Sequence, residues 1–169
     1  MNPTLAHWNT LPADEAAAVI LPTNGSQAWA EQMASHRPYP GEQTLFEVAD
    51  HIWYHLSDDA KQQAFDSHPR IGQRHAAKEA TAQSLTWSSQ EQTLSDDERV
   101  QQALAEANQK YEETFGRIFI VCATGKTQQQ MLAILEQRLH NDEETEFAEA
   151  AEQQRQITQL RLRKWLAAS

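Results

Sequence analysis

Apolar residues recur every three or four positions along most of this chain, and this helical spacing limits the folds that the chain can adopt. The clearest example is the segment 43–56, where one helix face would carry Leu45, Phe46, Ala49, Ile52, Trp53 and Leu56. Few segments alternate apolar and polar residues with the period of two that marks a half-buried strand. Only five of the 169 residues are glycine, and no repeat or low-complexity tract interrupts the pattern. The sequence therefore predicts an all-α fold, with residues 1–169 forming one compact multi-helix domain.

Turn and capping signals place the boundaries of the predicted helices. Helices are expected at 12–21, 26–35, 43–56, 57–65 and 143–167. A capping box at Ser95 begins a further helix that ends at Gly116, and Thr127 begins another. Between these two helices lies the apolar run 118–123 (IFIVCA), whose composition suits a strand but which has no partner strand. We expect a buried connector or a short helix there, whereas 66–87 breaks the helical pattern.

The charge of the chain limits its partners. Its 24 acidic and 14 basic residues give a formal net charge of −10. A field of that sign repels phosphate backbones and anionic membranes, so we expect neither nucleic acid nor a membrane as a partner. A small anionic ligand would need arginine or histidine to make its pocket locally positive.

Cysteine content and the first residues indicate the compartment. The only cysteine, Cys122, excludes an internal disulfide and any zinc site built from several thiolates. It lies in an apolar run without an adjacent base, which is typical of a packing residue. The first twenty residues have no basic start and no long apolar run, so no signal peptide is expected. We therefore expect a cytoplasmic protein.

The first candidate site is His68-Pro69-Arg70, in the main irregular stretch. A histidine there titrates near neutral pH and can move protons, and irregular segments on a rigid scaffold often carry catalytic groups. The alternative is a surface-loop histidine beside a turn proline. The tripeptide alone leaves both interpretations open.

The second candidate is the segment Ser88-Ser89-Gln90-Glu91-Gln92. If Ser88 opens a helix, Glu91 and Gln92 lie one turn further on a shared face. The Ser88 hydroxyl, the Glu91 carboxylate and the Gln92 amide could then bind one small polar ligand together. Ser-x-x-Glu is also an ordinary capping box, and the two interpretations are compatible.

The third candidate is Arg161, on the last predicted helix. At about 100° per residue, Ile157, Leu160 and Trp165 define the apolar arc, and Arg161 projects into its middle. Arg163 points outside this arc. A buried guanidinium requires a partner, because its desolvation is otherwise costly. That partner is either a bound ligand or an internal acid such as Glu47 or Glu91.

Other chemistry has weaker support in the sequence. His51 and His55 have the i, i+4 spacing of a metal pair, but no glutamate follows His51 and no third ligand is evident. There is also no phosphate loop, dinucleotide fingerprint or G-x-S-x-G motif. The residues alone thus indicate a helical domain with His, Glu, Gln and Arg in candidate roles, without identifying a substrate.

Several segments together resemble one family. Residues 64–72 (AFDSHPRIG) resemble the hallmark of the OHCU (2-oxo-4-hydroxy-4-carboxy-5-ureidoimidazoline) decarboxylase family. Residues 88–92 match its Ser-x-x-Glu-Gln motif, and 111–119 match its Tyr-x-x-x-Phe-Gly-x-x-Phe segment. The likeness covers roughly residues 20–166, with the motifs in the family order. One departure is Arg117-Ile118, where the family often has an aromatic residue and a proline.

The resemblance implies a cofactor-free helical enzyme, forming a homodimer, that converts the small anionic substrate OHCU into (S)-allantoin. By residue-by-residue carry-over, His68 is the catalytic proton donor and Glu91 lines the substrate site. As our own hypothesis from the reaction chemistry, Glu91 orients the His68 imidazole or binds the substrate ring. The remaining implied substrate-binding residues are Pro69, Ser88, Ser89, Gln90, Gln92, Phe119, Ile120, Val121, Cys122, Ala123 and Arg161.

The chemistry of OHCU agrees with a cofactor-free reaction. Its carboxylate is attached to a carbon next to an imine-type C=N, which accepts the electron pair left by departing CO₂. No pyridoxal phosphate, thiamine or metal is therefore expected. Two rival interpretations are a non-enzymatic acidic helical interaction module and a metal-dependent hydrolase using His51 and His55.

Overall fold

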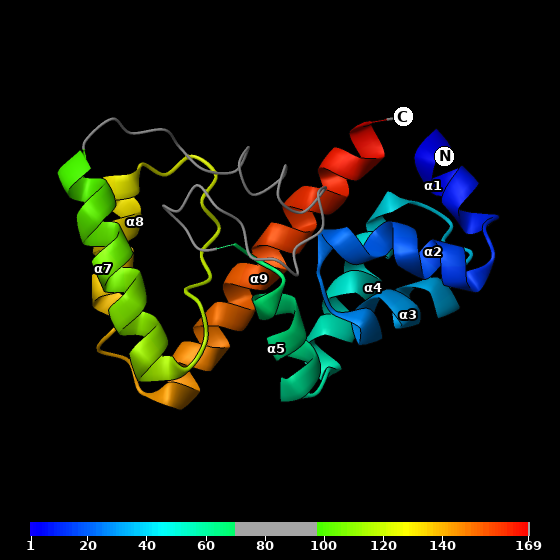
Figure 1. Ribbon diagram of the computed structural model, residues 1–169. Helices are drawn as coiled ribbons and strands as arrows, with labels where there is room; N and C mark the ends of the chain where they lie inside the picture. The colour runs from blue at the N-terminus through cyan, green and yellow to red at the C-terminus, as the bar shows by residue number, and fades with distance from the viewer. Residues whose placement is uncertain (70–97, 169) are drawn as a thin grey trace. The chain divides into compact units, whose positions relative to one another are not determined.

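The structure is a computed structural model that describes residues 1–69 and 98–168 (Figure 1). All regular structure in these residues is helical, which confirms the predicted all-α fold. The α-helices are α1 (Pro3–Asn9), α2 (Ala13–Ile20), α3 (Gln27–Ser35), α4 (Glu42–His55), α5 (Asp58–Asp66), α7 (Glu98–Phe115), α8 (Gln128–Arg138) and α9 (Glu143–Ala167), and a 3-10 turn η1 covers Leu21–Thr23. None of the described helices is both long and apolar enough to cross a bilayer.

The chain divides into two compact units. The first unit comprises residues 1–64 and 155–169, and the second comprises 65–154. Helix α9 contributes its N-terminal half to the second unit and its C-terminal end to the first. The expectation of one domain over 1–169 stays a prediction.

In the first unit, α1 was not expected from the sequence. Its seven residues are too few to show a period, but Asn2 caps it by accepting hydrogen bonds from the N–H groups of Thr4 (2.8 Å) and Leu5 (3.2 Å). Pro3 occupies the first helical position, where no N–H partner is needed. The unit's core lies mainly in α1 to α4 and includes the fully buried Leu5, Ile20, Trp29, Met33 and Leu45.

In the second unit, α7 and α8 pack against each other (Figure 1). Gly116 ends α7 with a φ of 73°, a conformation that glycine adopts readily, and Thr127 caps α8 in a capping box with Gln130. Residues 118–123, hereafter the connector, run without regular structure between them. The connector is buried at Phe119, Ile120, Val121 and Ala123, which confirms a buried connector rather than a short helix.

Candidate active site

His68 lies in the second unit just after α5 and is buried, with 8% of its surface exposed. Its N–H donates to the Phe65 carbonyl at 3.2 Å, which extends the end of the helix. Its Nε2 lies 2.6 Å from Oε1 of Gln154 on α9, and Gln154 is fully buried. The structure therefore contradicts the alternative of an exposed loop histidine.

Three side chains hydrogen-bond to the backbone of the connector. They belong to α8, to α9 and to Lys126, which lies just before α8. Arg138 Nη1 donates to the Ile120 carbonyl at 2.6 Å, and the Cys122 N–H donates to Oε1 of Gln153 at 2.8 Å. Lys126 Nζ donates to the Cys122 carbonyl at 2.7 Å. These contacts give fixed positions to backbone groups in an irregular segment.

Some connector amides have no partner in the part of the chain that the structure describes. The N–H groups of Ile120, Val121 and Ala123 donate to no described residue. Buried amides normally have a hydrogen-bond acceptor, whether protein, water or ligand. The connector can therefore donate to a polar ligand through its main chain.

A buried ionic network holds Arg138, the residue that contacts the connector. Glu146, fully buried in the first turn of α9, accepts from Arg138 Nε at 3.0 Å and from Arg138 Nη2 and the Tyr111 hydroxyl. The Arg138 guanidinium carbon also lies 4.6 Å from the centroid of the Phe119 ring. Burial, and then the hydrogen bond and charge of Glu146, raise the pKa of Tyr111 well above its ordinary value. This network was not predicted, because Glu146 belongs to an acidic helix start that suggests solvent exposure.

Arg117, where the family often has an aromatic residue, is buried and paired. Its Nη1 donates to Glu143 Oε1 at 2.6 Å, and its guanidinium lies 5.1 Å from the Phe147 ring centroid and 5.8 Å from that of Phe115. Its Nε and Nη2 have no hydrogen-bond partner among the described residues. The ion pair and the Phe147 contact join the residue before the connector to α9.

Arg161 lies in the first unit and is fully buried, whereas Arg163 is exposed. The helical-wheel prediction for both residues is therefore confirmed. Arg161 Nη1 donates to the Pro22 carbonyl at 3.3 Å. Glu47, considered as an internal acid for Arg161, is exposed.

The second predicted site segment cannot be placed relative to His68. Ser88, Ser89, Gln90, Glu91 and Gln92 lie outside the described residues, as does Arg70.

His51 and His55 are both exposed on α4, with ring centroids 4.3 Å apart. The His55 Nδ1–H donates to the His51 carbonyl at 2.8 Å, which is a local helix contact. Residues 1–69 and 98–168 contain no cluster of three or more His, Cys, Asp or Glu side chains able to hold a metal.

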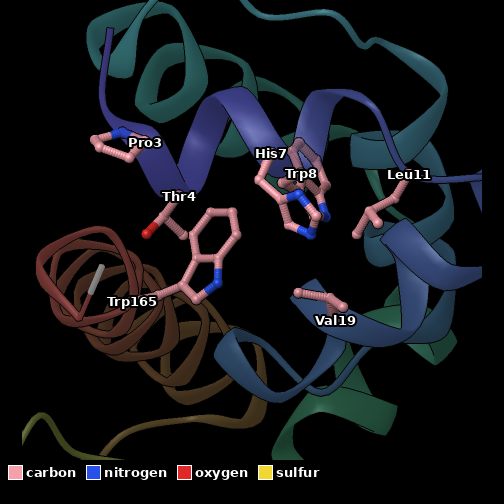
Figure 2. A pocket seen from close by; sticks show the side chains of 7 residues that line it. All are labelled: Pro3, Thr4, His7, Trp8, Leu11, Val19 and Trp165. Carbon is pink, nitrogen blue, oxygen red and sulfur yellow. The ribbon is translucent and has the colours of Figure 1, made fainter.

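The first unit has an apolar pocket of about 340 Å³ (Figure 2). It is lined by Pro3, Thr4, His7, Trp8, Leu11, Val19 and Trp165. None of the predicted site residues belongs to this lining. The polar groups suited to proton transfer and amide recognition lie instead around His68 and the connector.

Comparison with known proteins gives consistent matches. A sequence model of the family described as OHCU decarboxylase matches residues 9–163. The uric acid degradation bifunctional protein TTL of Arabidopsis thaliana is 32% identical over 153 residues, covering 83% of this chain and 44% of that protein. The uric acid degradation bifunctional protein of Bacillus sp. (strain TB-90) is 29% identical over 168 residues, covering 95% of this chain and 32% of that protein. The chain thus spans less than half of these relatives.

Solved structures match as well. A crystal structure of OHCU decarboxylase in the presence of (S)-allantoin aligns with a TM-score of 0.72 and 32% identity, covering 87% of this chain and 96% of that one. A crystal structure of (S)-allantoin synthase aligns with a TM-score of 0.68 and 21% identity, covering 95% of this chain and 53% of that one. The second match supports the fold alone.

Proposed function

Because the chain belongs to the OHCU decarboxylase family, we propose that it is a cofactor-independent lyase that converts OHCU into (S)-allantoin during urate breakdown. The observation that carries this proposal is the match along nearly the whole length of a solved OHCU decarboxylase that was crystallised with (S)-allantoin. The names of the curated relatives, which refer to uric acid degradation, support the same pathway.

The proposed reaction needs one proton and no external electron acceptor. The bond between the ring carbon and the carboxylate breaks, CO₂ leaves, and the electron pair moves into the adjacent C=N of the substrate. The resulting intermediate takes a proton on one face, and this facial delivery makes the product (S)-allantoin. We assign the proton to the His68 imidazolium, which regains it from water after each turnover. A positioned acid or base of this kind is typically worth ~10²–10⁴ in rate.

Main-chain and side-chain groups supply the binding contacts in this proposal. The backbone of Phe119 to Ala123 lines the site and binds the substrate ring. The N–H groups of Ile120, Val121 and Ala123 support this role, because they donate to no residue that the structure describes. Arg161 binds the carboxylate and provides the positive charge that an anion needs near a protein of net charge −10.

The segment 88–92 and Pro69 complete the proposed binding set. Ser88 and Gln92 bind the ureido and ring amides, Glu91 orients His68 or binds the ring, and Pro69, Ser89 and Gln90 line the site. These roles follow from the family motifs. Small polar ligands are generally recognised by a few such placed groups.

The test uses freshly generated OHCU, made in situ by urate oxidation and hydrolysis, with purified protein and a chelator. The decay of OHCU and the optical rotation of the product are followed together. We expect accelerated decay with accumulation of (S)-allantoin. Decay at the spontaneous rate to a racemic product, from folded protein, would refute the proposal and favour an interaction module. Activity that the chelator removes would refute the cofactor-free reaction.

We also propose a cytoplasmic homodimer, as the family resemblance implies. Light scattering coupled to gel filtration should give twice the chain mass of 19.2 kDa. Fractionation of the cells that produce the protein should recover it with the cytosol. A monomer at micromolar concentration, or recovery with another compartment, would contradict the respective part.

A further inference from the structure

Gln154 is a fully buried glutamine whose amide oxygen lies against the buried imidazole of His68. The two side chains are 86 residues apart in sequence, and Gln154 Oε1 is 2.6 Å from His68 Nε2. Both residues belong to the second unit. Nothing in the sequence motifs assigns a role to this glutamine.

The contact indicates which ring nitrogen of His68 carries the hydrogen when the imidazole is neutral. An amide oxygen is only an acceptor, so a hydrogen bond to it requires His68 Nε2 to hold a hydrogen. Neutral imidazole has one N–H, and the exchangeable position is then Nδ1. Both groups are buried, which makes an unsatisfied donor or acceptor costly and favours this tautomer.

We infer that Gln154 is a positioning residue for His68, holding it in the Nε2–H tautomer so that Nδ1 delivers the proton in the reaction. This inference rests on the proposed function for its chemical consequence, although the tautomer itself does not depend on it. The imidazolium transfers its Nδ1 proton to the carbon intermediate that remains after CO₂ leaves. His68 is left as the neutral Nε2–H tautomer, and water restores the Nδ1 proton.

The neighbouring glutamine connects the same helix to the connector. Gln153 Oε1 accepts the Cys122 N–H at 2.8 Å, while its Nε2 donates to Glu149 Oε1 at 3.0 Å. Consecutive residues of α9 thus hold the proposed proton donor and the proposed binding backbone. A rigid helix is well suited to this task, because groups that act together in catalysis must be held in a precise relative geometry.

The direct test is the tautomer of His68 in the wild-type protein, measured by ¹H–¹⁵N NMR at a pH where the imidazole is neutral. The signals of His68 are those that disappear in His68→Asn. We expect Nε2 protonated and Nδ1 unprotonated. A predominant Nδ1–H tautomer would overturn the inference, since the amide would then present its NH₂ group to Nε2.

The functional test compares three variants in the OHCU assay. Gln154→Leu removes the acceptor, and we expect kcat to fall roughly ten- to a hundred-fold with KM changed less than about three-fold, a part of the ~10²–10⁴ available to acid–base catalysis. Gln154→Glu keeps an acceptor and should recover most of the lost kcat. Gln156→Ala, at an exposed position of the same helix, should retain wild-type kcat.

The outcomes separate this inference from the proposed function. Equal kcat losses in Gln154→Leu and Gln154→Glu, with circular dichroism unchanged, would overturn the positioning role. If the wild-type protein does not decarboxylate OHCU, the proposed function fails, and the NMR result still decides whether Gln154 sets the tautomer. If Gln154→Leu does not fold, the tautomer measurement and Gln154→Glu decide the question.

Discussion

The buried carboxylate of Glu146 allows a quantitative test of how the connector is held. The change is Glu146→Gln, which keeps the shape of the side chain but removes its charge and replaces one acceptor oxygen with a donor. In the native protein the carboxylate accepts from four donor groups, namely Arg138 Nε and Nη2, the Tyr111 hydroxyl and Asn141 Nδ2. Arg138 is 5% exposed, so its charge has little access to water when the carboxylate is absent.

We predict a loss of about 3–5 kcal/mol in the free energy of unfolding, the usual effect of leaving one partner of a buried ion pair uncompensated. The individual hydrogen bonds to a charged group are worth about 1.5–3 kcal/mol each, but desolvation of both partners offsets much of their sum. For an m value of about 2 kcal/mol/M, the urea midpoint should fall by about 2 M.

The assay is equilibrium urea unfolding monitored by circular dichroism and tryptophan fluorescence. The matched control is Glu144→Gln, an exposed glutamate in the first turn of the same helix, where loss of the favourable helix-dipole interaction should cost about 0.3–1 kcal/mol. A double variant, Glu146→Leu with Arg138→Met, replaces both charges with apolar groups and should be more stable than Glu146→Gln.

Two results would refute this reasoning. A loss in Glu146→Gln no larger than in Glu144→Gln would show that the carboxylate does not compensate a buried charge. A double variant less stable than Glu146→Gln would show that the remaining arginine charge is not the source of the penalty. If Glu146→Gln is too unstable to purify, recovery of the folded double variant alongside the Glu144→Gln control would still show that the protein tolerates the loss of both charges better than the loss of one.

Three further predictions concern catalysis and pH. His68→Asn should abolish accelerated OHCU decay while leaving the circular dichroism spectrum unchanged; retained turnover would disprove the assignment of the proton donor. Arg161→Lys keeps the charge but loses the planar fork, so steady-state kinetics should show KM raised about ten-fold and kcat changed less, whereas an unchanged KM would argue against carboxylate binding. The pKa of Tyr111 is raised in the folded protein, so this side chain ionises first in the unfolded chain. The contribution of Tyr111 to the free energy of unfolding should therefore be complete below about pH 10 and decrease as the pH rises above it. Urea midpoints between about pH 8 and pH 11 should therefore fall less in Tyr111→Phe than in the wild type, and equal falls would contradict this assignment.

Much of the helical architecture can be predicted from the sequence because local chemistry sets helix ends. Thr127 satisfies an otherwise unpaired N–H at the start of α8, and Gly116 adopts the positive φ that ends α7. The apolar arc of the last helix likewise identified Arg161 as buried and Arg163 as exposed, since the period of 3.6 residues determines which side chains share a face. Helix α1 was missed because seven residues contain too few turns to show a period.

The family motifs also depend on sequence alone. His68 and the connector were identified from residues that are close together along the chain, and their joint order is specific even though each motif is short. Burial of His68 was not predictable from the tripeptide His68-Pro69-Arg70, because an irregular segment has no period that distinguishes an inward from an outward side chain.

Only the tertiary structure decided which polar residues of α9 contact Arg138, the connector and His68. Glu146, Gln153 and Gln154 resemble ordinary solvent-facing residues of a polar helix, yet they hold Arg138, the connector and His68. The helical period determines which residues share a face, but it carries no information about what packs opposite that face. Contacts between residues 86 positions apart, such as His68 and Gln154, exist only because folding brings separate helices together.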